Sequence, residues 1–333
     1  MLPLIAVPTT AGTGSETTGA AIMDLPKHEC KSGIRQRCIK PLLAIVQVVE
    51  EFLLAIKMDN YSMPRNVAIY SGFDVLCHAL ESYTALPYNV RTPRPSRPDL
   101  RPLYQGSNPI SDVWSLEALR IIGKYFRRSV ADNSDEEARQ NMLLASTFAG
   151  IIGKYFRRSV ADSSDEEARQ NMLLASTFAG VGFGNAGVHL CHGLSYPISS
   201  QGKLYYDKDY PDTKPLIPHG LSVVTTAVAD FEFLASSCPE RHAQVAMQLG
   251  ADVSESSNSS YIASKLCDEI RSFMQDFKVP NGLEAMGFQF SDIDKLSTAA
   301  VNSVVNIAIT PKSTDREIIS KIYEKSLKDF VIK

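Results

Sequence analysis

A segment of 30 residues occurs twice in direct succession in this chain. Residues 121–150 and 151–180 differ at one position only, where Asn133 is replaced by Ser163. A solenoid needs at least three repeats, and natural repeats diverge because only their core positions are constrained. Two nearly identical copies therefore indicate a recent exon duplication or an error in gene assembly. We expect the chain to fold around one copy while the other loops out.

Length and composition indicate a globular protein with one large or two medium domains. The 333 residues are 44% apolar, and 34 Lys and Arg stand against 37 Asp and Glu, which gives a net charge of −3. We expect no nucleic-acid partner, because the basic excess that phosphates require is missing. No apolar run approaches the ~20 residues that cross a bilayer, so we expect no membrane partner either. The cysteines lack paired spacing, which indicates free thiols: Cys30, Cys38, Cys77, Cys191, Cys238 and Cys267.

The pattern of apolar residues divides the chain into two regions. Residues 1–70 contain short apolar runs, and we predict an α/β domain there with strands at 2–7, 42–46 and 67–71. Residues 71–333 show helical spacing, and we predict an all-α domain that includes both copies of the repeat. Its helices are expected at 112–126, 136–150, 241–251, 259–277 and 315–330. The many prolines of residues 86–109 predict a long loop.

The segment SGFDVLCHALESY places a carboxylate and an imidazole four residues apart. On a helix, Asp74 and His78 lie on one face and can bind one ion. A carboxylate and an imidazole together suit Fe²⁺, Zn²⁺ or Mn²⁺. A structural role is the alternative, because Ser71 and Asp74 have the spacing of a capping box at a helix start. In that case His78 is a half-buried histidine.

Three further histidines lie in motif-like segments. His189 and His192 belong to GNAGVHLCHGLSYPIS, and His219 belongs to LIPHGLSVV. A His-Gly pair allows a close approach of the backbone while the imidazole points into a cleft. Three histidines and one carboxylate form a divalent-metal site that still has room for an oxygen ligand from a substrate. Alternatively, His189 and His192 lie one helical turn apart and simply pack in a core.

A glycine-rich loop, VPTTAGTGSETT, follows the first predicted strand. Its glycines allow backbone N–H groups to approach an anion, and its hydroxyls come from Thr9, Thr10, Thr13 and Ser15. The loop is neither a P-loop nor the GxGxxG fingerprint of dinucleotide-binding proteins. A polar turn without a ligand is the alternative.

Taken in their order along the chain, with the glycine-rich loop first, the four segments resemble the iron-containing alcohol dehydrogenase family. The sequence is most similar to its hydroxyacid-oxoacid transhydrogenase branch, whose members are mitochondrial. The resemblance implies that residues 1–70 are part of a dinucleotide-binding α/β domain and that residues 71–333 form the helical metal-binding domain. It implies a divalent metal, Fe²⁺ or Zn²⁺, with the ligands Asp74, His78, His192 and His219. It also implies contacts to NAD(H) from Thr9, Thr10, Thr13, Ser15 and Lys31.

The activity implied by this branch is hydride transfer from 4-hydroxybutyrate to 2-oxoglutarate through bound NAD. The products are succinic semialdehyde and 2-hydroxyglutarate, so the partners are small hydroxy and oxo acids. Within the branch, Tyr196 replaces a second histidine found in many microbial relatives. The loop before His219 contains three lysines that could pair with a substrate carboxylate: Lys203, Lys208 and Lys214. Alternatively, these lysines only solvate the surface, as exposed lysines usually do. The oligomeric state is left open, and a homo-oligomer is compatible with the resemblance.

Of three alternatives to this activity, two stay open and one is disfavoured. An NAD-dependent alcohol dehydrogenase of the same family would release its cofactor, and an inactive truncated product would fold only its helical domain. A metallohydrolase is disfavoured because no H-E-x-x-H motif occurs. Glu81, the acidic residue nearest to His78 on its C-terminal side, is expected to face solvent.

The chain also departs from the family. The family's cofactor domain begins upstream of Met1, so we expect that its first strands and phosphate-binding turn are missing and that NAD(H) binds weakly. Residues 47–58 read as an insertion before the first motif of the helical domain. The repeat lies between the segments that contain His78 and His192.

Overall fold

The computed structural model describes the chain in twelve segments. These segments comprise residues 5–6, 20–25, 30–35, 43–44, 64–90, 104–132, 134–139, 141–142, 183–202, 204–210, 215–301 and 307–330. The insertion predicted at 47–58 and the second copy of the repeat, residues 151–180, lie outside them.

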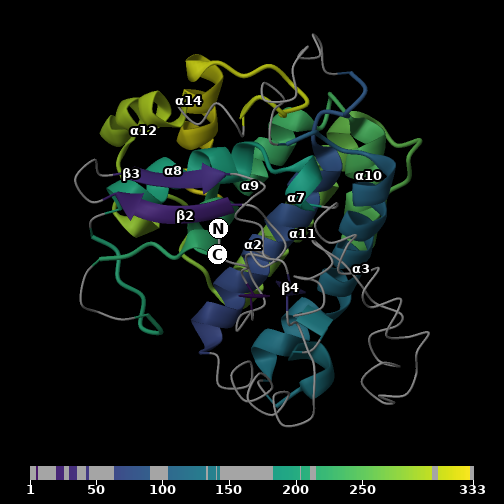
Figure 1. The fold of residues 1–333 in the computed structure, drawn as a ribbon, viewed down its shortest axis with the longest axis horizontal. Coiled ribbons are helices and arrows are strands. Elements are labelled where there is room, and N and C mark those ends of the chain that lie inside the picture. Colours follow the sequence, from purple (N-terminus) through teal and green to yellow (C-terminus); the bar gives the residue numbers. More distant parts are fainter. Residues whose placement is uncertain are drawn as a thin grey trace.

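Helices dominate the described residues (Figure 1). The α-helices are α2 (Arg65–Thr84), α3 (Pro109–Ala131), α7 (Phe183–Ala186), α8 (Leu190–Gln201), α9 (His219–Leu234), α10 (Pro239–Leu249), α11 (Ser259–Phe277), α12 (Ile293–Val301) and α14 (Arg316–Lys325). Two short 3₁₀ helices are η5 (Glu284–Met286) and η6 (Phe290–Asp292). The predicted helices at 112–126, 241–251, 259–277 and 315–330 are confirmed, with ends that differ by up to five residues. Of the helix predicted at 136–150, residues 136–139 and 141–142 are helical, and residues 143–150 lie outside the described segments.

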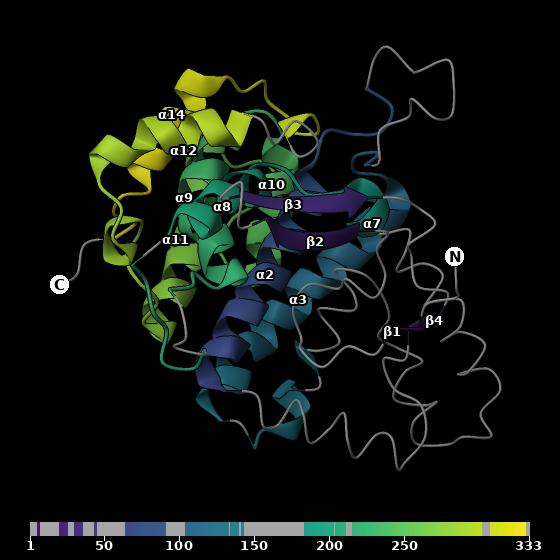
Figure 2. The ribbon, with the colours of Figure 1, turned by 60° about the vertical axis from the view of Figure 1, so that its left-hand side comes forward.

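Four short strands form two pairs near the beginning of the chain. Strand β1 (Ile5–Ala6) runs parallel to β4 (Leu43–Ala44), with Ile5 opposite Leu43. Strand β2 (Ala20–Leu25) runs antiparallel to β3 (Cys30–Arg35). Strand β3 lies beside α8 (Figure 2). Two of the three predicted strands therefore coincide with β1 and β4.

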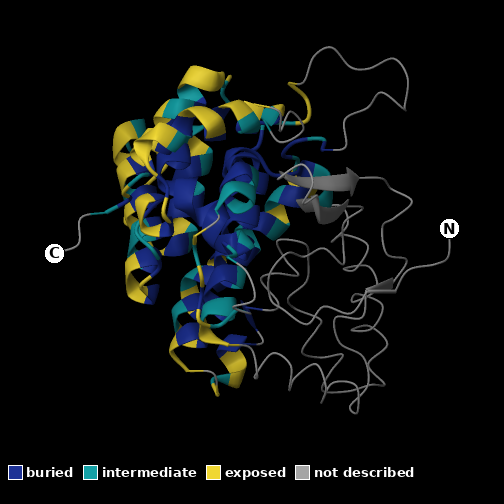
Figure 3. Cartoon of the chain, turned by 90° about the vertical axis from the view of Figure 1, so that its left-hand side faces the viewer, coloured by how far each residue is buried: buried dark blue, intermediate teal, exposed yellow. Residues whose placement is uncertain are grey.

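The strand predicted at residues 67–71 is wrong, because these residues belong to α2. Every residue from Gly72 to Thr84 is buried, so α2 is enclosed on all sides by the rest of the domain. A helix of this kind has no polar face toward solvent, and its short apolar runs look the same as those of a buried strand. Figure 3 shows the buried residues gathered in the interior of the helical domain.

Helix α3 packs along α2 and contains the beginning of the first repeat copy. The side chain of Asn108 caps this helix by accepting a hydrogen bond of 3.1 Å from the N–H of Ser111. Phe126 meets Phe73 edge to face, with ring centroids 5.3 Å apart. An added Cβ at Gly72 would lie 2.1 Å from the Phe126 ring, so this glycine allows the close contact. The first copy therefore supplies part of the central core.

Four of the six cysteines are free thiols in the described part of the chain, as predicted: Cys77, Cys191, Cys238 and Cys267. Among the helices that the structure describes, none is both long and apolar enough to cross a membrane.

Deletion of residues 151–180 is expected to leave the fold intact. The described core takes its contacts from the first copy, and Val181 then follows Gly150 in the same sequence context that Gly180 provides. The thermal midpoint by circular dichroism should equal or exceed that of the full chain. Deletion of 121–150 is a built-in control, because it yields the same sequence except for serine in place of Asn133. A midpoint lowered in both variants would show that the second copy contributes to the core.

Asp230 is a buried carboxyl group in α9 with little hydrogen bonding. Thr226 donates a hydrogen bond of 2.8 Å to Oδ2, while Oδ1 accepts none from the residues that the structure describes. Burial raises the pKa of Asp230 to about 8, and the nearby charge of Glu81 acts in the same direction. The folded protein therefore holds a proton that the unfolded chain has lost above about pH 4.

The substitution Asp230→Asn is expected to remove a pH dependence of stability. Because the folded state binds the additional proton, the free energy of unfolding falls as the pH rises from about 4 to about 8. The variant carries no titrating group at this position, so it should resemble the wild type at about pH 5 and be more stable at about pH 9. Urea midpoints at both values measure the effect, with the exposed Asp268→Asn as control. A variant that is less stable than the wild type at both values would contradict the expectation.

Candidate metal centre

Asp74 and His78 lie in the middle of α2, and both side chains are almost completely buried. Asp74 Oδ1 and His78 Nε2 are 3.8 Å apart. Because α2 begins at Arg65, Asp74 cannot cap its N-terminus, and the capping alternative from the sequence is wrong. The i, i+4 spacing instead directs both side chains to one point beside the helix.

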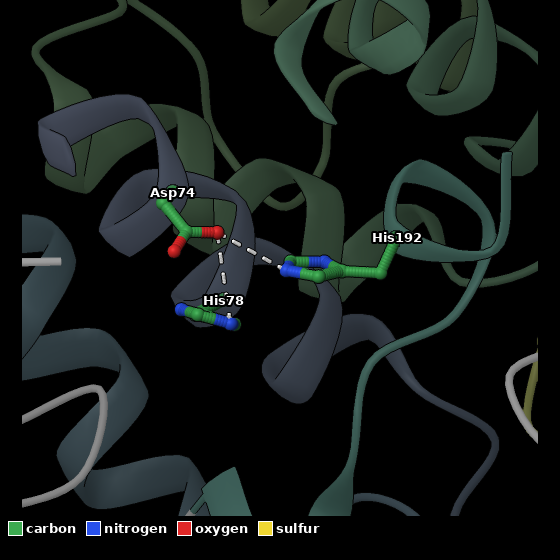
Figure 4. Close-up of side chains that lie close together, drawn as sticks. All are labelled: Asp74, His78 and His192. Carbon is green, nitrogen blue, oxygen red and sulfur yellow. Dashed lines mark hydrogen bonds and ion pairs between the residues drawn. The ribbon is translucent and has the colours of Figure 1, made fainter. Parts of the chain in front are cut away.

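Two other helices bring further imidazoles to the same carboxylate oxygen. His192 in α8 places Nε2 3.3 Å from Asp74 Oδ1, and His219 at the start of α9 places Nε2 3.5 Å from it. Figure 4 shows the side chains of Asp74, His78 and His192 pointing toward one another. The rings of His78 and His192 are stacked, with centroids 4.4 Å apart. Three imidazole nitrogens thus surround one carboxylate oxygen.

A glycine permits the approach of α9 to α2. An added Cβ at Gly220 would lie 1.7 Å from the carbonyl oxygen of Tyr70, which no side chain can tolerate without a shift of the helix. This is the close backbone approach that the His-Gly pair predicts, and it brings the neighbouring His219 to Asp74. The side chain of His219 is 32% exposed, whereas that of Asp74 is 3% exposed. The cluster is therefore open to solvent on the His219 side.

Glu81 is fully buried, so the expectation that it faces solvent is wrong. Its Oε1 accepts hydrogen bonds from the backbone N–H groups of His189 and His192, at 2.9 Å and 3.3 Å. Its Oε2 accepts a short hydrogen bond from Nδ1 of His192. Although burial raises the pKa of Glu81, His192 outweighs burial and lowers it, so the group is an ionised acceptor.

This contact fixes the state of the His192 ring. Because a carboxylate only accepts, Nδ1 of His192 carries the hydrogen and Nε2 points to Asp74. A carboxylate behind a histidine is the common arrangement that orients a metal-binding imidazole. The sequence contained a signal for Glu81, since it follows Asp74 by seven positions and His78 by three, on the same helical face.

His189 serves the core instead of the cluster. Its Nδ1 accepts the backbone N–H of Leu190 at 2.9 Å, and its Nε2 lies 3.0 Å from Oγ1 of Thr84. The Thr84 hydroxyl donates to the carbonyl of Leu80, so it accepts from His189. Burial lowers the pKa of His189 to about 4. Both ring nitrogens of His189 are thus engaged in hydrogen bonds within the core. This agrees with the alternative from the sequence, in which His189 packs in a core.

Burial and charge together decide the protonation of the cluster. Burial lowers the pKa of His78 to about 3, against the attraction of Asp74. Burial opposes a charge on His192 as well, but Glu81 and Asp74 outweigh it and raise the pKa to about 10. The pKa of Asp74 is lowered, since the three imidazoles outweigh burial. A positive charge is therefore stable at this position, and a divalent cation can replace the imidazolium proton.

Three of the other predicted site residues lie within the described segments. Lys31 lies in β3, and Lys208 is exposed. The ring of Tyr196 is parallel to that of His219, with centroids 6.5 Å apart. Six predicted residues lie outside the described segments: Thr9, Thr10, Thr13, Ser15, Lys203 and Lys214.

Glu81→Gln is expected to weaken the binding of Zn²⁺ or Co²⁺. The amide cannot both satisfy the two backbone N–H groups and hold Nδ1 of His192, so the ring loses its fixed orientation. Loss of such a partner typically costs about 10–100-fold in metal affinity. Competition with a chelating dye measures the dissociation constant, and Glu117→Gln, at a partly exposed position of α3, is the matched control. Equal affinities in wild type and Glu81→Gln would contradict the assignment.

Two family descriptions match the chain. The description "Fe-containing alcohol dehydrogenase family, C-terminal" matches residues 103–152 and 151–327, and "Iron-containing alcohol dehydrogenase" matches residues 1–48. The two C-terminal matches meet where the second copy of the repeat begins.

Curated relatives are similar along almost the whole chain. The hydroxyacid-oxoacid transhydrogenase, mitochondrial, of Caenorhabditis briggsae is 64% identical over 327 residues, which cover 98% of this chain and 62% of the relative. The human protein of the same name is 46% identical over 328 residues, covering 98% of this chain and 61% of the relative. The chain thus spans about three fifths of the length of these relatives.

Solved structures share the fold. An archaeal alcohol dehydrogenase from a Red Sea brine pool superimposes with a TM-score of 0.70 at 23% identity, covering 98% of this chain and 64% of the other. Sulfoacetaldehyde reductase from Bifidobacterium kashiwanohense, in complex with NAD⁺, gives a TM-score of 0.66 at 21% identity, covering 98% and 65%. The chain therefore has the fold of these enzymes over the matched length.

Proposed function

Because the chain belongs to the Fe-containing alcohol dehydrogenase family, we propose that its buried cluster binds one divalent cation. The ligands are Asp74, His78, His192 and His219. The observation that carries this proposal is the convergence of three Nε2 atoms on Asp74 Oδ1, at 3.3–3.8 Å. The donor set of one carboxylate and three imidazoles fits Fe²⁺ or Zn²⁺.

The surroundings of the cluster support a catalytic use of the cation. When bound, such a cation lowers the pKa of a substrate hydroxyl and stabilises the charge that develops on a carbonyl oxygen. Glu81 holds His192 in place, and the burial of Asp74 and His78 keeps solvent away from one side. The exposed side of His219 is where a substrate oxygen can enter.

We infer that the reaction is a hydroxyacid-oxoacid transhydrogenation. Bound NAD would carry the hydride from 4-hydroxybutyrate to 2-oxoglutarate, so that the products would be succinic semialdehyde and 2-hydroxyglutarate. The identities of 64% and 46% to enzymes of that name support this activity. Their names also support a mitochondrial location for this chain.

The N-terminal region is proposed to bind NAD(H). Residues 1–48 match the family, and the parallel pairing of β1 with β4 is typical of a nucleotide-binding α/β domain. The proposed contacts are Thr9, Thr10, Thr13, Ser15 and Lys31. On this proposal residues 1–70 are part of the cofactor domain, and residues 71–333 are the catalytic helical domain.

The test is a two-substrate assay with the purified 333-residue chain after loading with Fe²⁺ or Zn²⁺. We expect equal amounts of succinic semialdehyde and 2-hydroxyglutarate, at an NAD⁺ concentration high enough to compensate for the weak cofactor binding that the sequence predicts. The variant His219→Ala should lower turnover by about 100-fold, comparable to the loss of a metal-orienting group. The variant should still fold, although with a lower melting temperature, because two imidazoles stay beside Asp74 and His219 is the most exposed of the four side chains.

Two results would contradict this reading. Accumulation of free NADH from 4-hydroxybutyrate without 2-oxoglutarate would favour the second candidate, an NAD-dependent alcohol dehydrogenase. Unchanged turnover in His219→Ala would remove the cluster from the reaction. Tyr206→Ala is the control for a change at an exposed residue of the same connecting segment, between α8 and α9.

A further inference from the structure

Asp207 is a buried carboxylate that is surrounded by hydrogen-bond donors. Nδ2 of Asn66 lies 3.0 Å from each of its oxygens, and the hydroxyl of Tyr70 donates to Oδ2 at 2.8 Å. The hydroxyl of Tyr205 donates at 3.2 Å, and the backbone N–H of Asp209 donates to Oδ1 at 3.0 Å. Among the described residues, no Lys, Arg or His forms an ion pair with this carboxylate.

These contacts tie the segment between α8 and α9 to the beginning of α2. The first N–H groups of a helix have no partners within the helix. In α2 these groups also receive no side-chain cap from Pro64, the residue before the helix. Asp209 supplies one partner, since its Oδ2 accepts the N–H of Asn66 at 2.8 Å. Negative charge at this end of α2 is also favoured by the helix dipole.

The same segment leads directly into the metal centre. It begins after Gln201 and ends at His219, so it joins the two helices that carry His192 and His219. The N–H of Leu216 donates to the carbonyl of Tyr205 at 2.9 Å, which holds the far end of the segment beside Asp207.

Tyr70 connects Asp207 to His219. Its hydroxyl binds Asp207, and its carbonyl oxygen is the atom against which Gly220 packs. Tyr70 also lies one helical turn before Asp74, on the same face of α2.

We propose that Asp207 is a positioning residue for the metal centre, which clamps the α8–α9 segment to α2 and so fixes His219 relative to Asp74. The proposal rests on the proposed metal site. His219 depends on such a clamp more than the other ligands do, because its side chain is 32% exposed and is less held by the core. The partners of Asp207 are all donors, which is why a carboxylate, with acceptors only, fits the position.

The variant Asp207→Asn tests the clamp, because its amide group turns two hydrogens toward groups that also donate. We expect the affinity for Zn²⁺ to fall about 10-fold, the lower end for loss of a partner that orients a ligand. Release of Co²⁺ to EDTA should accelerate, and the visible spectrum of the Co²⁺ protein should change. In the metal-free protein, amide hydrogen exchange should accelerate in the first turn of α9.

Asn281→Ala is the matched control for a loss of buried hydrogen bonds elsewhere. Oδ1 of Asn281 accepts the N–H groups of Asp329 and Phe330, and its Nδ2 donates to the carbonyl of Phe330. This variant should lower the melting temperature without changing Zn²⁺ affinity or the exchange rate in α9. Tyr70→Phe, which removes a single donor, should act as Asp207→Asn does but more weakly, and it serves if Asp207→Asn does not fold.

The outcomes separate the clamp from the metal site. Unchanged Zn²⁺ affinity and unchanged exchange in α9 for both Asp207→Asn and Tyr70→Phe would overturn the clamp. An equal loss of affinity in Asn281→Ala would also overturn it, since the effect would then be one of general stability. If the wild-type chain takes up neither Zn²⁺ nor Co²⁺, the metal proposal fails, and exchange in α9 alone decides whether Asp207 holds the segment.

Discussion

The structure depends on a carboxylate that is buried in the middle of a helix. Desolvation of Asp74 is costly, and it is offset only because three imidazoles surround one of its oxygens. Each imidazole needs its own support: His78 comes from the same helix, His192 is held by Glu81, and His219 is brought close by Gly220. The arrangement of α2, α8 and α9 is thus the arrangement that satisfies this one group.

The supporting groups also explain why α2 is the central helix. A helix that carries buried carboxylates on one face and Phe73 on another must be covered on all sides. Glu81 adds a second buried charge to α2, and it is paired with the backbone N–H groups at the beginning of α8 as well as with an imidazole. The buried negative charges of α2 are therefore compensated by groups of the same helices that pack around α2 and complete the core.

The sequence predicted those parts of the site that follow from spacing along one element. The i, i+4 pair of Asp74 and His78, the helical periods of α3, α10, α11 and α14, and the His-Gly pair at 219–220 all belong to this class. The prediction from the sequence failed at positions where burial determines how a residue is read. Residues 67–71 look like a strand because a helix enclosed on all sides has no polar face toward solvent. Glu81 looks solvent-exposed because its partners lie in or next to α8, more than 100 residues away.

The repeat is compatible with this site because chain length between the ligands matters little once the helices pack. Asp74 and His192 are 118 positions apart, and one repeat copy contributes 30 of them. Closure entropy grows with the logarithm of the separation, so the additional copy costs only about 0.3 kcal/mol in bringing α8 to α2. Contacts such as that of Phe126 with Phe73 are made by the first copy. The ligands therefore converge through the packing of three helices, and the second copy need not take part in that packing.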